Sequence, residues 1–354
     1  MRIIQIIDSL DIGGSEKMAV NYANALSNRI EFSGLVVTRK EGELKKQLIE
    51  KVHYLFLNRK STIDIMAVLK LRNFCKKNKI NYLQAHSSSF FTAILIKLTL
   101  PKLKIIWHDH NGLSEFLSTR KSFALKLASF LFDRVIVVND QLKIWAEREL
   151  YCKKIIYLSN FTTLSKDEVP LTKLQGFDRK KILCLANLRI QKNHFLLLDV
   201  AEKILESHPE WTFHLVGKDF NDDYSSQIKE LIILKKMSEN VFIYGSKNDT
   251  TAIISQADIA ILTSQSEGLP VVILEYGLSK KAVVSSEVGE IPSIINDGIN
   301  GFLVPKYDKD KFFVSLLKLI QNETLREDMG NNLHKTILKN HSEEIIIRNY
   351  LNWI

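Results

Sequence analysis

The hydrophobic pattern along the chain alternates between two spacings. Short β-branched and apolar runs, such as "RIIQIID" at 2–8 and "KILCLANL" at 181–188, have the length of buried strands. Longer stretches between them, such as "SEKMAVNYANALSN" at 15–28, space their apolar residues like one face of a helix. Strand, helix and strand in this order predict parallel sheets with helices on both faces.

The same alternation occurs twice along the chain. The first half carries "SGLVVT", "KIIWHDH" and "RVIVVN", and the second carries "TFHLVGKD", "ADIAILTS" and "AVVSSEV". A polar stretch without clear periodicity separates them at 161–181. We therefore predict an α/β fold with two Rossmann-like parallel-sheet domains, the first over 1–165 and the second over 166–335.

Charge divides the chain in the same way. The 354 residues carry a net charge of +9, but 1–165 hold 26 Lys and Arg against 14 Asp and Glu, while the rest has a net charge of −3. The cations gather at 70–79 and 119–132, where the apolar spacing is helical. A basic amphipathic helix can lie on an anionic membrane surface, and a solvated helix face is the alternative. We expect no nucleic acid partner, since no aromatic interleaving or known nucleic-acid module is present.

The cysteines and the lengths of the apolar stretches indicate in which cellular compartment the protein is expected. Cys75, Cys152 and Cys184 lie far apart without metal-type spacing, which indicates a reducing, cytoplasmic setting. We interpret the N-terminal run as a first strand rather than a signal peptide. The longest apolar stretch, at 90–100, is too short for a membrane span and is broken by a lysine.

Two loops of the first half are candidate ligand sites, because open parallel sheets bind ligands at the carboxyl ends of their strands. Gly13 and Gly14 precede a predicted helix, so bare backbone could approach a phosphate there; a tight turn capped by Ser15 is the alternative. His108 and His110 lie two apart on an extended segment and point the same way. They could bind a hydroxyl or act as a base, or be ordinary core or surface histidines.

Two loops of the second half suggest a more specific ligand. Arg189 and Lys192 stand beside a helix start capped by Asn193, which suits a diphosphate, although solvated loop cations are the alternative. In "SQSEGLPVVILEYG", at 264–277, Glu267 and Glu275 flank an apolar run, where burial is costly unless each carboxylate finds a partner. Helix-start amides together with two carboxylates suit a ligand that has both phosphates and hydroxyls, namely a nucleotide sugar.

Taken together, these segments resemble the retaining, GT-B-fold glycosyltransferases of family four, the glycosyl transferases group 1. The resemblance covers nearly the whole chain and is strongest over 181–305, where "NLRIQKNHFLLLDVA", "FHLVGKD", "VFIYGSKNDT", "SQSEGLPVVILEYGLSKKAVV" and "EVGEIPSIINDGINGFLVP" follow in the family's order. It implies two domains that close across a central cleft and a C-terminal segment, 336–354, that crosses back to the first domain. It also implies sugar transfer with retention, from a UDP- or GDP-sugar, without a metal or other cofactor.

The resemblance also assigns roles to residues. Arg189 and Lys192 resemble the pair that holds the diphosphate and stabilises the leaving nucleotide, Glu267 the residue that binds sugar hydroxyls, and Glu275 the residue that holds the ribose. His110, more than His108, is similar to the family's sugar-contacting histidine and is counted with the catalytic group. The other residues expected at the donor are Gly13, Gly14, Gly217, Gly245, Gly268, Leu269 and Pro270.

The acceptor is less well defined by the sequence. The basic first domain favours a glycan or lipid-linked acceptor and peripheral contact with an anionic membrane, as in bacterial surface polysaccharide or lipid-glycan biosynthesis. Alternatives are a nucleotide-sugar epimerase of the same architecture and a nucleotide-binding pseudoenzyme; a dinucleotide oxidoreductase would need a glycine fingerprint that is missing. We interpret the acidic residues at 308–310 as a helix cap, and those at 221–223 as part of a polar loop just ahead of a helical stretch, rather than as metal sites.

Overall fold

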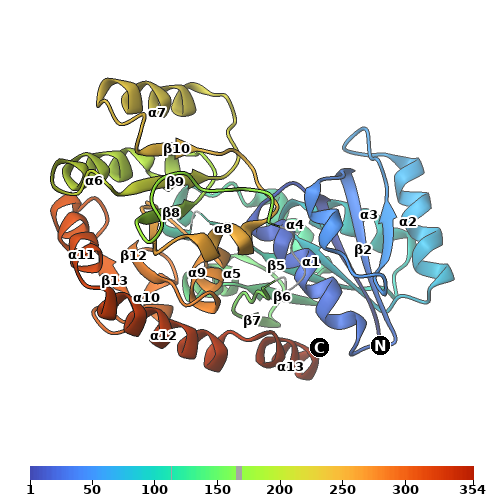
Figure 1. Cartoon of the computed structure of the whole chain (residues 1–354). Coiled ribbons are helices and arrows are strands. Elements are labelled where there is room, and N and C mark those ends of the chain that lie inside the picture. The colour runs from blue at the N-terminus through green and yellow to red at the C-terminus, as the bar shows by residue number, and fades with distance from the viewer. Residues whose placement is uncertain (113, 165–169) are drawn as a thin grey trace. The chain divides into compact units, whose positions relative to one another are not determined.

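The computed structural model describes residues 1–112, 114–164 and 170–354, which form two compact units (Figure 1). Unit 1 comprises Met1–Phe161 and Glu343–Ile354, and unit 2 comprises Thr162–Ser342. The predicted boundary between 165 and 166 lies outside the described residues. The predicted start of the terminal segment at 336 is wrong, because helix α12 (Glu323–Asn340) continues through that position within unit 2.

Unit 1 is built on a seven-stranded parallel sheet with strand order β3-β2-β1-β4-β5-β6-β7. Its strands are β1 Arg2–Ser9, β2 Phe32–Lys40, β3 His53–Phe56, β4 Tyr82–His86, β5 Lys104–Asp109, β6 Arg134–Val137 and β7 Ile155–Tyr157. Its helices are α1 Gly14–Ser27, α2 Ile65–Lys77, α3 Phe90–Thr99, α4 Phe123–Ala128, α5 Asp140–Glu149 and α13 Glu343–Trp353.

Unit 2 is built on a six-stranded parallel sheet with strand order β10-β9-β8-β11-β12-β13. Its strands are β8 Lys181–Leu185, β9 Thr212–Val216, β10 Val241–Ile243, β11 Ile259–Leu262, β12 Ala282–Ser286 and β13 Phe302–Val304. Its helices are α6 His194–Ser207, α7 Asp223–Leu234, α8 Thr250–Gln256, α9 Val271–Leu278, α10 Ile291–Ile294, α11 Lys309–Gln321 and α12. Two parallel sheets with intervening helices confirm the predicted fold class.

Strand β1 shows why helices cover both faces of the sheet. Successive side chains of a strand point to opposite faces, and Ile3, Ile4, Ile6 and Ile7 are all at most 3% exposed. Both faces of β1 are therefore buried, which is the pattern of a continuous apolar run in a parallel sheet. Helix α1 supplies part of this cover through its contacts with β1 and β2.

The last helix, α13, belongs to unit 1 although it follows unit 2 in the sequence. Its Tyr350 is fully buried and its ring meets that of Tyr22 in α1 edge to face, with centroids 5.1 Å apart. Glu343 at the start of α13 accepts a 2.7 Å hydrogen bond from Arg29. The chain terminus is held as well, because Tyr82 and Arg134 both donate to the carbonyl oxygen of Ile354.

Two helical glycines should respond oppositely to alanine. At Gly330 in α12 a Cβ would overlap the carbonyl oxygen of Lys280, whereas at Gly14 in α1 nothing lies within 4 Å of that position. Gly330→Ala should lower the free energy of unfolding by about 2 kcal/mol, because the overlap outweighs the gain in helix propensity. Gly14→Ala should leave it unchanged or raise it by up to about 1 kcal/mol. Urea unfolding measures both, and wild-type stability in Gly330→Ala would contradict the packing described for α12.

Candidate active site

The predicted site residues lie where strands end at their carboxyl sides, as expected for open parallel sheets. In unit 2, Arg189 and Lys192 follow β8, and Glu267 follows β11. In unit 1, Gly13 follows β1, and His110 follows β5.

A buried ion pair is the central feature of unit 2. The Nζ atom of Lys192 lies 2.5 Å from Oε1 of Glu267, and this oxygen also accepts a 2.6 Å hydrogen bond from the hydroxyl of Ser264. The exposed fractions of the two charged side chains are 18% and 7%. A carboxylate buried to this extent needs such partners, because an unpaired charge away from water is very costly.

Backbone contacts connect the loops that carry the two charges. Lys192 ends a short 3₁₀ turn, η5 (Ile190–Lys192), and its carbonyl oxygen accepts a 2.9 Å hydrogen bond from the hydroxyl of Thr263. The amide of Gln265 donates to the carbonyl oxygen of Gln191 at 2.8 Å. The 3₁₀ turn and the loop after β11 are thereby joined by hydrogen bonds to two main-chain carbonyls, independently of the charged side chains.

Arg189 is one of two cations that lie close to the aromatic ring of Phe220. Its guanidinium lies 4.6 Å from the centre of the Phe220 ring, and the ammonium of Lys218 lies 5.2 Å from the same centre. Arg189 itself is exposed. Lys218 was missed by the sequence analysis, although it lies within the predicted run "TFHLVGKD" at 212–219, two residues after the end of β9.

Helix α9 carries Glu275, which is 7% exposed. The hydroxyl oxygen of the next residue, Tyr276, accepts a 2.8 Å hydrogen bond from the amide of Leu185, so α9 is held against the end of β8. Pro270 occupies the N-cap position, and the helix begins at Val271. Leu269 is buried, with 3% of its surface exposed.

The loop after β12 packs on the backbone of Glu267 and Gly268. Gly289 has a φ of +55°, and a Cβ there would overlap the carbonyl oxygens of both residues. The amide of Glu290 donates to the carbonyl oxygen of Gly268 at 2.9 Å. This bond uses only main-chain atoms, so it does not depend on the side chain at position 290.

Gly217 and Gly245 have a structural reason to be glycine. A Cβ at Gly217 would overlap the carbonyl oxygen of Ala186, and its amide donates to the carbonyl oxygen of Gly245 at 3.0 Å. Gly245 has a φ of +69°, a conformation that side chains disfavour. A nearby interpretation needs correction: Asn193 stands at the N-cap of α6 but makes no side-chain capping bond, and its own backbone is left-handed.

The glycine turn of unit 1 differs from the expected one. Gly13, not Ser15, is the N-cap of α1, and its backbone is extended. The Glu16 carboxylate lies where a Cβ of Gly13 would stand, and it accepts a 2.8 Å hydrogen bond from the Ser15 hydroxyl. The turn therefore offers a carboxylate acceptor as well as backbone amides, which suits a hydroxyl at least as well as a phosphate.

Three histidines cluster at the ends of β4 and β5. The rings of His108 and His110 lie 3.9 Å apart, as their spacing predicted, and His86 joins them with its Nδ1 2.9 Å from Nε2 of His110. Desolvation lowers the pKa of His110 to about 3. Burial and the neighbouring imidazoles lower the pKa values of His86 and His108 well below the usual range. All three rings are therefore neutral at pH 7.

His86 was missed by the sequence analysis. Its signal is the pair Gln84 and His86, two polar residues that share one face of a strand otherwise apolar enough to be buried.

Among the described residues, the three histidines are the group whose nitrogens lie close enough, within 4.8 Å, to hold one metal ion. Both nitrogens of His86 already make hydrogen bonds, to Gln5 and to His110, so the cluster is accounted for without a metal. Asp308 caps α11, as predicted, by accepting from the amide of Lys311, and Asp222 in the polar loop at 221–223 caps α7 by accepting from the amide of Ser225. The expectation of a metal-free enzyme stays a prediction.

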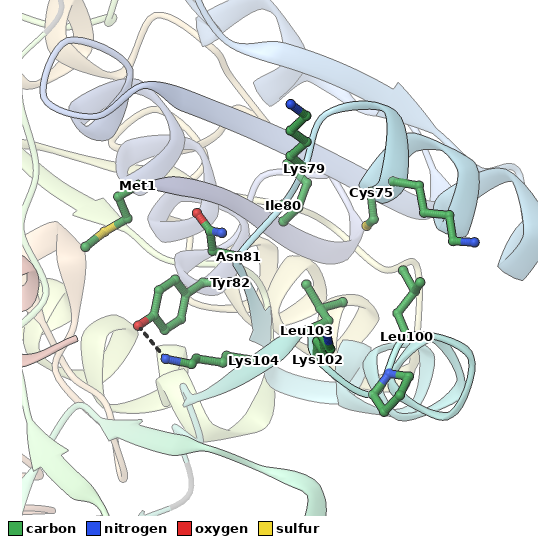
Figure 2. A pocket seen from close by; sticks show the side chains of 12 residues that line it. Met1, Cys75, Lys79, Ile80, Asn81, Tyr82, Leu100, Lys102, Leu103 and Lys104 are labelled. Carbon is green, nitrogen blue, oxygen red and sulfur yellow. Dashed lines mark hydrogen bonds between the residues drawn. The ribbon is translucent and has the colours of Figure 1, made fainter.

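A separate pocket of about 740 Å³ lies at the opposite, amino-terminal ends of β4 and β5 (Figure 2). Lys76, Lys79, Lys102 and Lys104 line it, and Lys104 donates to the hydroxyl of Tyr82 at 3.3 Å. The predicted donor residues are absent from its lining. It belongs to the basic surface of unit 1.

The chain has two doubly wound parallel-sheet units, and cations and carboxylates lie at their strand ends. These features define the class of sugar-transferring GT-B proteins. Family models match both halves: Glycosyltransferase Family 4 over residues 12–165 and Glycosyl transferases group 1 over residues 173–336. The chain belongs to this glycosyltransferase family and is a transferase.

Similar proteins extend this assignment. The chain is 25% identical over 342 residues to the Escherichia coli UDP-Gal:alpha-D-GlcNAc-diphosphoundecaprenol alpha-1,3-galactosyltransferase, covering 89% of this chain and 86% of the relative. It is 25% identical over 220 residues to the Staphylococcus aureus poly(ribitol-phosphate) alpha-N-acetylglucosaminyltransferase, covering 62% of this chain but only 43% of that protein. Anabaena HepE, solved with UDP and glucose, has the same fold with a TM-score of 0.82 at 16% identity, over all of both chains.

None of the helices within the described residues is both long and apolar enough to cross a bilayer.

The buried histidines predict acid-sensitive stability. A histidine whose pKa is lowered by folding stabilises the native state fully above its unfolded pKa of about 6.5, and this contribution is lost as the pH falls below that value. His341, whose pKa burial lowers to about 4, should therefore cost about 2 kcal/mol of unfolding free energy between pH 7.5 and 5. Urea unfolding at both pH values should show a smaller loss for His341→Asn than for the wild type. The exposed His53 is the control, and equal losses in wild type, His341→Asn and His53→Asn would contradict the argument.

Proposed function

We propose that this glycosyltransferase moves a sugar from a nucleotide-sugar donor to a glycan or lipid-linked acceptor, with retention of the anomeric configuration. The observation that carries the proposal is the buried pair of Lys192 and Glu267, with the exposed cation of Arg189 following the same strand. A diphosphate needs cations, a sugar needs hydrogen-bond acceptors, and this loop pair supplies both.

Donor binding would exchange the partners of the ion pair. Without a ligand, Glu267 neutralises Lys192. A diphosphate that approaches Lys192 and Arg189 competes for the ammonium and frees the Glu267 carboxylate to accept from sugar hydroxyls. Glu275 on α9 would accept from the ribose. Both charges are thus in place before the donor arrives, which lowers the cost of reorganisation during the reaction.

In the transfer step the bond between the anomeric carbon and the diphosphate oxygen breaks, and a bond from an acceptor hydroxyl oxygen to that carbon forms on the same face. Lys192 and Arg189 stabilise the charge that develops on the leaving diphosphate. The departing phosphate oxygen takes the proton of the acceptor hydroxyl, so the step needs no separate protein base. Among the unit 1 residues, His110 would contact a sugar hydroxyl.

The similar proteins favour a UDP-sugar donor and a lipid-linked acceptor. The Escherichia coli relative uses UDP-Gal and acts on a diphosphoundecaprenol-linked sugar, and HepE was solved with UDP. We extend these properties to this chain, and with them a place in the synthesis of bacterial surface glycans.

The donor site is tested by binding and turnover. UDP should raise the thermal unfolding midpoint, and chelator should not abolish the shift, because cations of the protein rather than a metal hold the diphosphate. Lys192→Ala and Glu267→Ala should each lower turnover at least about 100-fold, the usual size of a lost electrostatic contact in a transition state. The control is Lys203→Ala, which removes an exposed ion pair with Asp310 in the same unit.

Wild-type turnover in either site variant would refute the assignment of these residues. An altered or free sugar released from the donor without any acceptor would instead indicate the epimerase. Nucleotide binding without turnover would indicate a pseudoenzyme.

We further propose that unit 1 contacts an anionic bilayer through α4 and the turn that follows it. Phe123, Leu127 and Phe130 are 78%, 51% and 64% exposed, and their spacing of four and three residues places them on one helical side. Lys121 lies two residues before Phe123, and Lys126 lies between Phe123 and Leu127. Exposed aromatic residues interleaved with lysines suit the interface of a membrane that carries negative headgroups.

The membrane contact is tested by co-sedimentation with vesicles. Wild-type protein should sediment with phosphatidylglycerol vesicles more than with phosphatidylcholine vesicles, and salt should weaken the binding because the lysine contribution is screened. Phe123→Ser with Phe130→Ser should reduce sedimentation several-fold. Ile233→Ser with Leu234→Ser, at exposed apolar positions of unit 2, is the matched control. Equal binding to both vesicle types would refute the contact.

A further inference from the structure

Four polar side chains form a row inside the sheet of unit 1. Gln5, Gln84, His86 and His108 are each 0% exposed. Gln5 pairs in register with Gln84, and His86 with His108, while Gln84 and His86 are two residues apart on β4. Register partners and alternate residues share a face, so all four project to the same side of the sheet.

Helix α1 covers that side of the sheet. The ring of its Tyr22 lies 6.2 Å from that of His86 and 5.5 Å from that of His108. Polar groups under such a cover are costly unless they are hydrogen-bonded.

Hydrogen bonds divide the row into two separate sets. In the first, Oε1 of Gln5 lies 2.8 Å from Nε2 of His86, and Nδ1 of His86 lies 2.9 Å from Nε2 of His110. In the second, Nε2 of Gln84 lies 3.0 Å from Nδ1 of His108. Only the first set ends at His110, the residue assigned above to a sugar hydroxyl.

The first set determines which nitrogens carry protons. An amide oxygen can only accept, so Nε2 of His86 must donate to Gln5. A neutral imidazole carries one proton, which leaves Nδ1 of His86 as an acceptor. Nε2 of His110 must then donate to it, and Nδ1 of His110 is left without a proton.

We propose that Gln5 and His86 are positioning residues that hold His110 in its Nε2-protonated tautomer, so that its Nδ1 accepts a hydrogen bond from a substrate hydroxyl. The inference rests on the proposed function for the contact between His110 and a sugar, but the tautomer itself does not. It makes the His110 position selective for a group that donates, a hydroxyl, over an ether or a fluorine at the same place.

The tautomer is measured directly, without any substrate. Protein labelled with ¹⁵N-histidine should show a pyridine-type Nδ1 and a pyrrole-type Nε2 for His110, assigned by comparison with His110→Asn. In Gln5→Leu the tautomer population of His110 should shift, because the acceptor that orients His86 is gone. In Gln84→Leu, the matched loss of a buried amide on the neighbouring strand, it should not shift. A protonated Nδ1 in the wild type would overturn the proposal.

Kinetics test whether the tautomer matters for transfer. Gln5→Leu should lower kcat/KM for the donor roughly fivefold, the effect of one hydrogen bond of ordinary strength, while Gln84→Leu changes it less than twofold. His86→Asn, whose amide oxygen can replace Nδ1 as acceptor, should retain more activity than His86→Leu. Equal losses in Gln5→Leu and Gln84→Leu would show a structural role only and overturn the positioning role.

Two further outcomes separate this proposal from its premises. If the wild type has the predicted tautomer but His110→Ala transfers sugar at the full rate, the sugar contact is refuted, and with it the substrate part of the proposal. This outcome would leave the donor site in unit 2 untouched. A shift of all three imidazole signals by one equivalent of Zn²⁺ would show that the cluster is a metal site, and would overturn the hydrogen-bond chain.

Discussion

The ion pair between Lys192 and Glu267 is the interaction on which the candidate donor site depends. Two loops that follow different strands each bring one charge into a largely buried environment, where an unpaired charge is costly. The hydrogen bonds from Thr263 and Gln265 to the backbone of the 3₁₀ turn keep the loops together. Gly289 then has to be glycine, because its loop lies directly on the backbone of Glu267. Each of these features follows from holding one carboxylate and one ammonium together near the ends of parallel strands.

Unit 1 solves the problem of buried polar groups in a different way. The three clustered histidines His86, His108 and His110 carry no charge, because desolvation lowers their pKa values, so they need hydrogen bonds rather than counter-ions. A neutral imidazole is a donor on one nitrogen and an acceptor on the other, which makes a chain of such rings directional. The two units therefore offer different chemistry: unit 2 offers fixed charges that suit a diphosphate, and unit 1 offers oriented neutral groups that suit hydroxyls.

Much of the fold was predictable, because strands buried on both faces and helices with one apolar side leave clear periodic patterns. Ion pairs between residues that are far apart in the sequence leave no such pattern. Glu267 was recognised as a carboxylate in need of a partner, but nothing near it in the sequence indicated that the partner is Lys192, 75 residues away. His86 was missed because the pair of Gln84 and His86 in one strand does not show which residues of the adjacent strands lie beside it. The alternative in which Ser15 caps α1 is wrong: serine is a common capping residue, but Gly13 is the N-cap and Ser15 donates to Glu16.

The ion pair in unit 2 also explains why a transferase would keep its key lysine, Lys192, paired when no ligand is bound. An unpaired ammonium that is 18% exposed would lose much of its hydration, and its burial would oppose folding. Pairing it with Glu267 removes that cost, yet the pair is only as strong as its geometry and partial solvation allow. A diphosphate carries more negative charge than one carboxylate and can also engage the exposed Arg189, so it competes effectively for Lys192. The same carboxylate that stabilises the empty site is then released beside the sugar, where an acceptor for hydroxyls is needed.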